Sequence, residues 1–162
     1  MINLEYRVIN KDRINDIVDM RLKYLREDFQ STSEESFNSV KDNLPKYFEN
    51  HLNRDLFVFG AFYGDKIVST AFLLIIEKPC NPRFTTGRIG EIFSVYTLEE
   101  YRRQGIAYNL LKMLMEFAKN HRLDLIELKA TKEGYPLYQK LGFSENAANY
   151  VSMKFIFNTN ET

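Results

Sequence analysis

Cysteine and histidine are scarce in this chain, which has one cysteine and two histidines in 162 residues. A single cysteine excludes an intramolecular disulfide and a cysteine-based metal cluster, so we expect no metal. It also fits a reducing, cytoplasmic compartment. Cys80 lies in a polar loop, and His51 and His121 lie near the expected ends of helices. None of the three is therefore favoured as a catalytic nucleophile or base.

The chain also lacks net charge and long apolar runs. Its 22 lysines and arginines balance its 22 aspartates and glutamates, so no global field attracts nucleic acid or an anionic membrane surface. The apolar runs are far too short to cross a bilayer, and the first residues lack the apolar core of a secretory signal. Neither nucleic acid nor a membrane is expected as a partner.

No internal repeat, linker or low-complexity segment divides the chain, so we expect residues 1–162 to form one domain. Apolar periodicity and turn residues predict both strands and helices in it. The strands are expected at 4–9, 56–63, 66–76, 88–96, 124–130 and 150–157. The helices are expected at 12–28, from 32 to near 52, from 106, and at 136–141. This β-α-α-β-β-β-α-β-α-β order predicts a mixed α/β fold with a parallel crossover over 88–130.

Local signals define the ends and faces of these helices. Thr32 and Glu35 have capping-box spacing and predict the start of the second helix, which Pro45 interrupts or restarts. Gly142 is expected to close the last helix in a left-handed conformation. Arg21 falls inside the apolar stripe of the first helix. It is either an ion-paired or snorkelling side chain, or an inward-pointing ligand contact.

The most informative stretch runs from Ile92 to Ala107. It reads as a strand, a tight polar turn and a basic, glycine-containing loop that opens a helix. The first backbone N–H groups of a helix have no partner inside it, and the helix dipole favours negative charge there. Gly105 has no Cβ, so a phosphate can approach the backbone closely. The stretch therefore predicts a site for a phosphate-bearing ligand.

Two blocks of this sequence resemble a known family. Arg102, Gly105 and Ala107 fit the pattern Arg/Gln-x-x-Gly-x-Gly/Ala, and residues 137–143 read Leu-Tyr-Gln-Lys-Leu-Gly-Phe, which fits Leu-Tyr-x-Lys-x-Gly-Phe. The order of the two blocks, their separation and the helices and strands on which they are expected match the GNAT superfamily of N-acetyltransferases, which use acetyl-CoA. The chain therefore resembles this family. The resemblance covers most of the chain and is clearest over 88–143.

The resemblance implies a GNAT-like mixed sheet that is splayed between the fourth and fifth strands. It places the pantetheine arm of acetyl-CoA along the strand backbone at Val95, Tyr96 and Thr97. It places the pyrophosphate on backbone N–H groups of a loop and first helical turn, namely Arg102, Arg103, Gln104, Gly105, Ile106, Ala107 and Tyr108. Thr131 stands where many relatives have a cofactor-contacting asparagine, and its hydroxyl could donate only one hydrogen bond.

The resemblance also implies direct attack of an amine on the thioester, without an acyl-enzyme. Glu91 is the candidate general base, because it is a carboxylate within an apolar strand and some family members carry a catalytic glutamate there. The alternative is a glutamate that faces solvent or pairs with Arg88 or Lys129. Tyr138 is the candidate general acid, since family members with a tyrosine here point its phenol at the cofactor sulfur. The alternative is a purely packing role in an apolar patch.

The leading interpretation is an acetyl-CoA-dependent N-acetyltransferase that acts on a small-molecule amine or a protein amine. The acceptor is expected between the first two helices and the loop 77–88. Several acidic residues there either favour a cationic amine or simply form a solvated surface, namely Glu27, Asp28, Glu34, Glu35 and Glu77. Two alternatives stay open: a non-catalytic acyl-CoA sensor, and a nucleotide-binding interaction domain with a different fold. An exposed final strand would also allow a homodimer.

Overall fold

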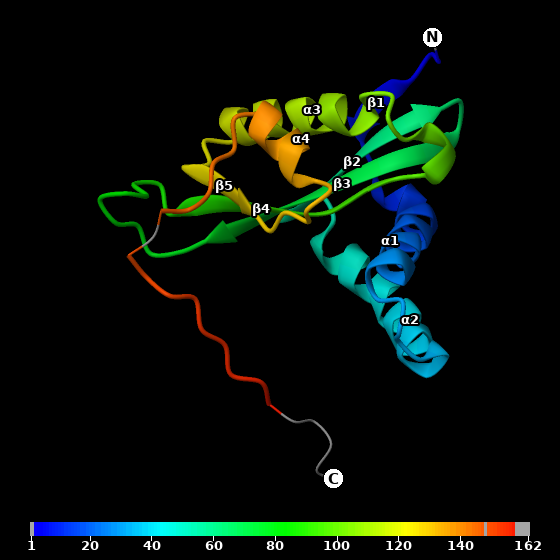
Figure 1. Ribbon diagram of the computed structural model, residues 1–162, viewed down its shortest axis with the longest axis horizontal. Coiled ribbons are helices and arrows are strands. Elements are labelled where there is room, and N and C mark those ends of the chain that lie inside the picture. Colours follow the sequence, from blue (N-terminus) through cyan, green and yellow to red (C-terminus); the bar gives the residue numbers. More distant parts are fainter. Residues whose placement is uncertain (1, 148, 158–162) are drawn as a thin grey trace.

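The computed structural model describes residues 2–147 and 149–157 (Figure 1). Its strands are β1 (Glu5–Val8), β2 (Leu56–Tyr63), β3 (Lys66–Glu77), β4 (Arg88–Thr97) and β5 (Leu125–Leu128). Its α-helices are α1 (Ile14–Asp28), α2 (Glu34–His51), α3 (Ile106–Asn120) and α4 (Tyr135–Lys140). Two 3-10 turns, η1 (Lys11–Arg13) and η2 (Glu99–Tyr101), precede α1 and α3.

The strands form one mixed sheet in the order β1-β2-β3-β4-β5. All neighbours are antiparallel except β4 and β5, which are parallel and joined through α3. Helices α3 and α4 lie on one face of the sheet, whereas α1 and α2 lie on the other (Figure 1). The predicted mixed α/β fold is therefore confirmed.

Each face of the sheet has its own apolar cluster, because successive strand side chains point to opposite faces. The cluster under α1 and α2 includes Ile17, Phe48, Val58, Phe62 and Phe72. The cluster under α3 includes Phe59, Leu73, Leu110, Leu111 and Leu114. Both faces of β2 and β3 are covered, which explains why these strands read as nearly continuous apolar runs.

The sheet is splayed between β4 and β5, as expected. The two strands pair only from Ile89 with Leu125 to Ile92 with Leu128, while β4 continues to Thr97. The register between β3 and β4 shifts between Thr70 and Phe72, opposite Ser94. Ser94 has a φ of 51°, so the backbone bulges there and β4 turns away from the line of β5. Among the residues that the structure describes, no strand therefore pairs with the last five residues of β4 on that side.

The expected final strand is wrong for the described residues. Residues 149–157 form no strand, and their large apolar side chains are between 69% and 89% exposed. A strand needs a partner ladder, and this segment runs away from the sheet in Figure 1 instead of along β5. The sheet of the described chain therefore ends at β5.

The second helix also differs from expectation at its start and at Pro45. Ser33, not Thr32, is the N-cap, and its side-chain oxygen accepts a hydrogen bond from the N–H of Ser36. Pro45 lies inside one continuous helix. Phe37 and Phe48 are buried on either side of it, so packing against the sheet holds the helix together through the proline.

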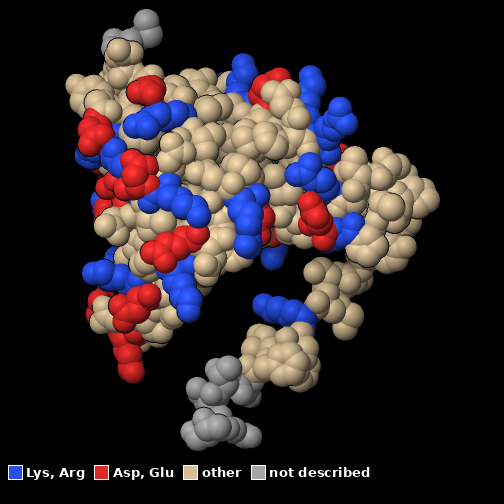
Figure 2. All heavy atoms as spheres, turned by 180° about the vertical axis from the view of Figure 1, so that it is seen from behind, with Lys and Arg blue, Asp and Glu red and all other residues tan. Residues whose placement is uncertain are grey.

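Basic and acidic side chains are interspersed over the face of the molecule seen in Figure 2. No helix within the described residues is long and apolar enough to cross a lipid bilayer. The described residues also bring together no group of three histidine, cysteine or acidic side chains that could hold a metal ion.

Candidate functional site

The free edge of β4 provides a backbone surface next to the splay. On its other side, Tyr96 pairs with Thr70 of β3 and Thr97 pairs with Ser69. The Ser69 hydroxyl donates to the Tyr96 carbonyl at 3.0 Å and lies 2.8 Å from the Thr97 hydroxyl. These contacts hold the end of β4 on its β3 side. The Thr97 carbonyl accepts a hydrogen bond from Arg102, and the remaining backbone of Val95 to Thr97 that faces away from β3 can pair with the amides of an extended ligand.

The N-terminus of α3 is open to an anion. Gly105 precedes the helix with a φ of 75°, and no side chain caps the helix. The first helical hydrogen bond there joins the Asn109 N–H to the Gly105 carbonyl at 3.1 Å, which leaves the N–H groups of Ile106, Ala107 and Tyr108 for a ligand. A Cβ built on Gly105 would meet no atom within 4 Å, so the approach is unobstructed. Gly105 itself is required by its left-handed backbone.

Arg102 braces the loop that leads to α3. Its Nε donates to the Thr97 carbonyl at 2.8 Å, and its Nη2 lies 2.8 and 2.9 Å from the two carboxylate oxygens of Glu27. Its backbone N–H donates to the Glu99 carbonyl at 3.1 Å. Arg103 and Gln104 are exposed on the outside of the same loop, and Arg103 has a φ of 61°. The structure therefore leaves Arg103 and Gln104 near the anion site and commits the Arg102 side chain to α1.

Glu27, Tyr96 and Arg102 form one cluster that sequence reasoning did not find. The Tyr96 hydroxyl donates to Glu27 Oε1 at 2.8 Å. Burial, followed by the hydrogen bond and charge of Glu27, raises the pKa of Tyr96 to about 12. Glu27 was expected to attract the acceptor, but here it ties the end of α1 to β4. No local motif signals this contact, because 75 residues separate Glu27 from Arg102.

Glu91 lies on β4 on the same face as Phe93, toward α1 and α2. Its side chain is half-buried, and within the described residues it makes no hydrogen bond or ion pair. Arg88 pairs with Glu77 instead, at 3.6 Å. Across the parallel ladder, Glu91 stands directly opposite Glu127 of β5. The carboxylate of Glu91 is thus free to accept a proton at the start of the splay.

Tyr138 approaches the splay from α4. Its ring packs edge-to-face against Phe143, with the ring centroids 5.9 Å apart. Burial, with a smaller contribution from Tyr24, raises the pKa of Tyr138 to about 12. Its hydroxyl has no hydrogen-bond partner in the described part of the chain, so it can donate to a ligand. Thr131 accepts a hydrogen bond from the Gly134 N–H at 3.1 Å, which holds the turn that leads into α4.

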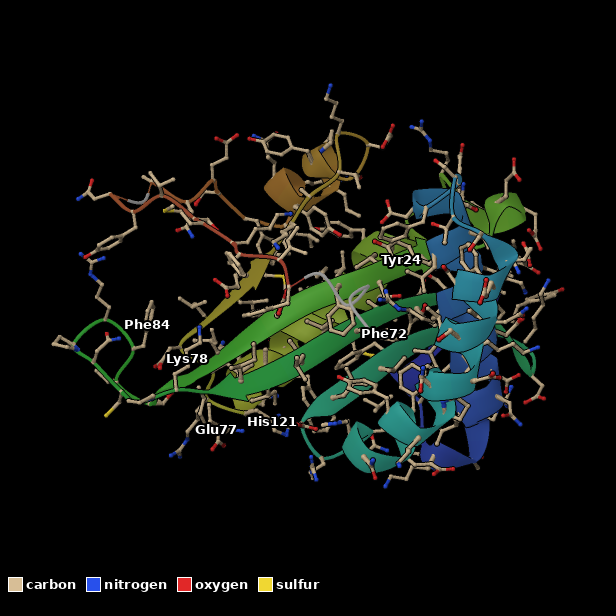
Figure 3. All side chains as sticks on the ribbon, turned by 90° about the horizontal axis from the view of Figure 1, so that it is seen from below. Tyr24, Phe72, Glu77, Lys78, Phe84 and His121 are labelled. Carbon is tan, nitrogen blue, oxygen red and sulfur yellow. The ribbon has the colours of Figure 1, made fainter. Side chains whose placement is uncertain are left out.

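Helix α1 faces the splayed part of β4 with aromatic and basic side chains. The ring of Tyr24 lies 6.4 Å from that of Tyr96, and the Arg21 guanidinium lies 5.4 Å from the Tyr24 ring and 5.6 Å from the Phe93 ring. Tyr24 lies between α1 and the sheet in Figure 3. Helices α1 and α4 lie on opposite faces of the sheet (Figure 1), so they flank it from opposite sides.

The loop between β3 and β4 lies elsewhere. In Figure 3, Glu77, Lys78 and Phe84 lie at the far end of the sheet from Tyr24 and α1. The expectation that this loop joins the first two helices around the acceptor is therefore wrong. The loop is instead held against β5, since Asp124 accepts hydrogen bonds from Thr86 and Gly87. A long β3–β4 hairpin carries its tip away from the helices.

The other residues that the sequence singled out make local contacts or are exposed. Glu34 pairs with Arg26 on the surface, and the Nδ1 of His51 lies 2.9 Å from Asp55. His121 ends α3, and its Nδ1 donates to the Phe117 carbonyl at 2.8 Å. Cys80 is exposed in the hairpin loop.

Comparison with known proteins gives a consistent result. The family model described as "Acetyltransferase (GNAT) family" matches residues 19–143. A curated N-alpha-acetyltransferase from Saccharolobus solfataricus is 42% identical over 115 residues, which cover 66% of this chain and 69% of that protein. A predicted acetyltransferase from Clostridium acetobutylicum, whose crystal structure was solved with acetyl-CoA, is 28% identical with a TM-score of 0.80 over 94% of this chain and 96% of that one. A GCN5-related N-acetyltransferase from Ralstonia eutropha has the same fold, with 20% identity and a TM-score of 0.78 over 93% of this chain and 99% of its own.

Proposed function

Because this chain belongs to the GNAT acetyltransferase family, we propose that it transfers the acetyl group of acetyl-CoA directly to a primary amine. One observation carries the proposal: the uncapped N-terminus of α3 lies next to the unpaired edge of β4. The first can hold a diphosphate and the second can pair with the two amides of a pantetheine arm. Together they fit the two parts of one elongated ligand.

The residues of this chain fit two parts of acetyl-CoA, the pyrophosphate and the pantetheine arm. The N–H groups of Ile106, Ala107 and Tyr108, with Gly105 and the outer residues Arg103 and Gln104, would hold the pyrophosphate. The backbone of Val95 to Thr97 would hold the pantetheine arm, and its thioester would supply the activated acetyl group. Arg102 would keep the loop in shape through Thr97 and Glu27.

Glu91 and Tyr138 provide the proton transfers. Glu91 would take a proton from the incoming amine, directly or through one water, so that the nitrogen attacks with its lone pair. As the new N–C bond forms and the C–S bond breaks, Tyr138 would donate its phenolic proton to the departing sulfur. A pKa of about 12 keeps Tyr138 protonated at neutral pH, as a proton donor requires. Thr131 would act indirectly, by holding the turn before α4.

The acceptor proposed here is an α-amine. The support is the similarity to an N-alpha-acetyltransferase over 115 residues, a stretch that includes 66% of this chain. Glu91 and Glu127, side by side on β4 and β5, would attract an amine that arrives as an ammonium ion. A non-catalytic acyl-CoA sensor is less well supported, because it gives no role to Tyr138 and Glu91, an acid and a base that have no hydrogen-bond partner among residues 2–147 and 149–157.

A panel of amines tests this function. The purified chain is incubated with acetyl-CoA and peptides with free α-amines, polyamines, aminoglycosides or free amino acids, and thiol release is measured together with the mass of the product. The proposal is supported if an acceptor with a free α-amine gains the mass of one acetyl group. Binding of acetyl-CoA without transfer to any amine would favour the sensor, and stabilisation by ATP but not by acetyl-CoA would favour a nucleotide-binding domain.

The assembly we propose is a homodimer. The segment 150–157 exposes its apolar side chains, and within the described part of the chain β5 has a strand on only one side. An open groove of about 530 Å³ lies beside β5, between α3 and α4. Its apolar lining is Met115, Ala118, Leu123, Leu125, Ile126 and Leu141. If residues 150–157 of a second copy paired along β5, the exposed apolar segment and the groove would both be covered.

Light scattering tests this dimer. It should give a dimer mass for the full chain and a monomer mass after removal of residues 149–162; a monomeric full chain would contradict the dimer.

A further inference from the structure

Arg21 is a half-buried cation without a partner. Within the described residues, three other arginines are also half-buried, and each has a carboxylate within 4.0 Å: Arg7 with Glu5, Arg13 with Asp16, and Arg88 with Glu77. No carboxylate in the described ranges comes that close to Arg21, and no hydrogen bond joins it to them. It differs in this respect from every other half-buried arginine there.

Its surroundings hold the side chain in place without neutralising it. The guanidinium lies over the rings of Tyr24 and Phe93, at 5.4 and 5.6 Å from their centroids. Aromatic faces attract a cation but leave its N–H donors unsatisfied at the edges. Burial lowers the pKa of Arg21, and the smaller electrostatic effects of Tyr24, Asp28 and Tyr47 only partly offset this lowering. A planar, fork-shaped donor set is thus fixed in orientation and left without an acceptor.

The position of Arg21 relates it to the reacting atoms. Phe93 is the first β4 residue beyond the last pair with β5, so Arg21 lies at the opening of the splay. Glu91, the proposed base, is two residues earlier on the same face of the same strand. Side chains two residues apart on a strand are neighbours on one face, about 7 Å apart along it. A cation from α1 and a carboxylate of β4 therefore lie over the same face of the strand, at the opening of the splay.

The energetics argue against a purely structural arginine. A half-buried guanidinium without a counter-ion loses hydration that aromatic contacts do not fully replace. Leucine or methionine would fill the same space in α1 beside Ile17 and Val18 without that penalty. The guanidinium fork matches the geometry of a carboxylate or phosphate, which would supply the missing acceptor atoms.

We propose that Arg21 binds an anionic group of the acceptor, so that the preferred substrate carries a carboxylate or phosphate close to the amine that is acetylated. This inference rests on the proposed N-acetyltransferase function and adds the chemical class of its acceptor. Glu91 receives the amine and Arg21 receives the anion, which orients the acceptor along β4. Such an anion is either the α-carboxylate of a free amino acid or an acidic side chain at the start of a peptide.

Matched pairs of acceptors test the inference in the full chain. One arm compares the peptides Ser-Glu-Ala-Ala-Gly and Ser-Gln-Ala-Ala-Gly, which differ only in the charge of the second side chain. The other arm compares free glutamate with glutamate α-amide, so the two sources of the anion are separated. Each pair is measured with wild type, Arg21→Met and Arg21→Lys, after confirming that all three bind acetyl-CoA.

We expect kcat/KM to be roughly tenfold or more higher for the charged member of one pair than for the neutral member. The difference should lie in KM, because the neutral member cannot form the charge-assisted hydrogen bond. Arg21→Met should remove this preference, while Arg21→Lys should keep part of it. Transfer to these amines without a charge preference, or with a preference that survives in Arg21→Met, would overturn the inference and leave the acetyltransferase function intact. No transfer to any acceptor while acetyl-CoA is bound would overturn both. If Arg21→Met does not fold, the wild-type preference and Arg21→Lys still decide the question.

Discussion

Arg102 and Glu27 join the loop before α3 to the end of α1, with the Arg102 Nη2 lying 2.8 Å from one carboxylate oxygen and 2.9 Å from the other. The same carboxylate accepts a hydrogen bond from Tyr96. One acidic side chain therefore links α1, which would face the acceptor, to the strand and loop that would hold the donor. A change at Glu27 should be felt at the donor site, although Glu27 itself contacts no phosphate-binding group.

The first prediction concerns Glu27→Ala. The two side chains are 39% and 51% exposed, so the ion pair should contribute no more than about 1 kcal/mol to stability, and the melting temperature should change little. The loop would lose its brace, however, and the Kd for acetyl-CoA should rise roughly threefold to tenfold. Calorimetry on Glu27→Ala, with Glu34→Ala as a control because Glu34 pairs only with Arg26 on the surface, checks this. Equal affinities for all three proteins would show that the brace is irrelevant to the donor.

The second prediction concerns the general acid. Tyr138→Phe keeps the ring that packs against Phe143 but removes the proton donor. The value of kcat should fall about a hundredfold with little change in KM for acetyl-CoA. Tyr135→Phe on the same helix is the matched control, since the Tyr135 hydroxyl bonds to Glu145 on the surface. If both variants turn over at the wild-type rate, Tyr138 serves packing alone.

The third prediction concerns stability at alkaline pH. The pKa of Tyr138 is about 12 in the folded chain, whereas an unfolded tyrosine titrates near 10. A raised folded pKa means that the folded state keeps its proton longer, so this contribution is present below pH 10 and is lost as the pH rises from about 10 to 12. Denaturant unfolding should show a smaller loss of stability across this interval in Tyr138→Phe than in wild type. An identical loss in both would show that Tyr138 titrates normally.

The fourth prediction concerns the base. Glu91→Gln preserves the shape of the side chain but cannot accept the proton, so kcat at pH 7 should fall by about a hundredfold to a thousandfold while acetyl-CoA binding is kept. Glu127→Gln, on the paired residue of β5, is the matched control and should change kcat little. The reverse ranking of the two variants would move the catalytic base to β5.

The sequence was a good guide where local physics decides the structure. The apolar runs of β2 and β3, the helical spacing after Gly105 and the left-handed Gly142 depend on neighbours along the chain, and the structure agrees with all of them. The splay between β4 and β5 also came from sequence, although it rested on the family resemblance. The backbone cause, a bulge at Ser94, has no signal in the residue types.

The rest depends on contacts between distant segments. The Glu27–Tyr96–Arg102 cluster and the lone Arg21 appear only when α1 is laid across β4. The final strand failed for a related reason: the apolar pattern of 150–157 suits a strand, but pattern alone cannot supply the edge against which it would pair. The sequence placed the loop of the β3–β4 hairpin wrongly, because the length of a loop does not predict where the tip of its hairpin lies.

The most direct test of the account measures acetyl-CoA binding at the N-terminus of α3. Gly105→Asp would place a carboxylate beside the pyrophosphate, and Gly64→Asp in the β2–β3 turn is its matched control. Both glycines have a positive φ, 75° and 58°, and both have open space where a Cβ would stand, so the backbone strain of the two variants should be similar. Titration calorimetry should find acetyl-CoA binding in wild type and Gly64→Asp and a loss of at least about a hundredfold in Gly105→Asp. Equal affinity in folded Gly105→Asp, or no binding by the wild-type chain, would contradict the account.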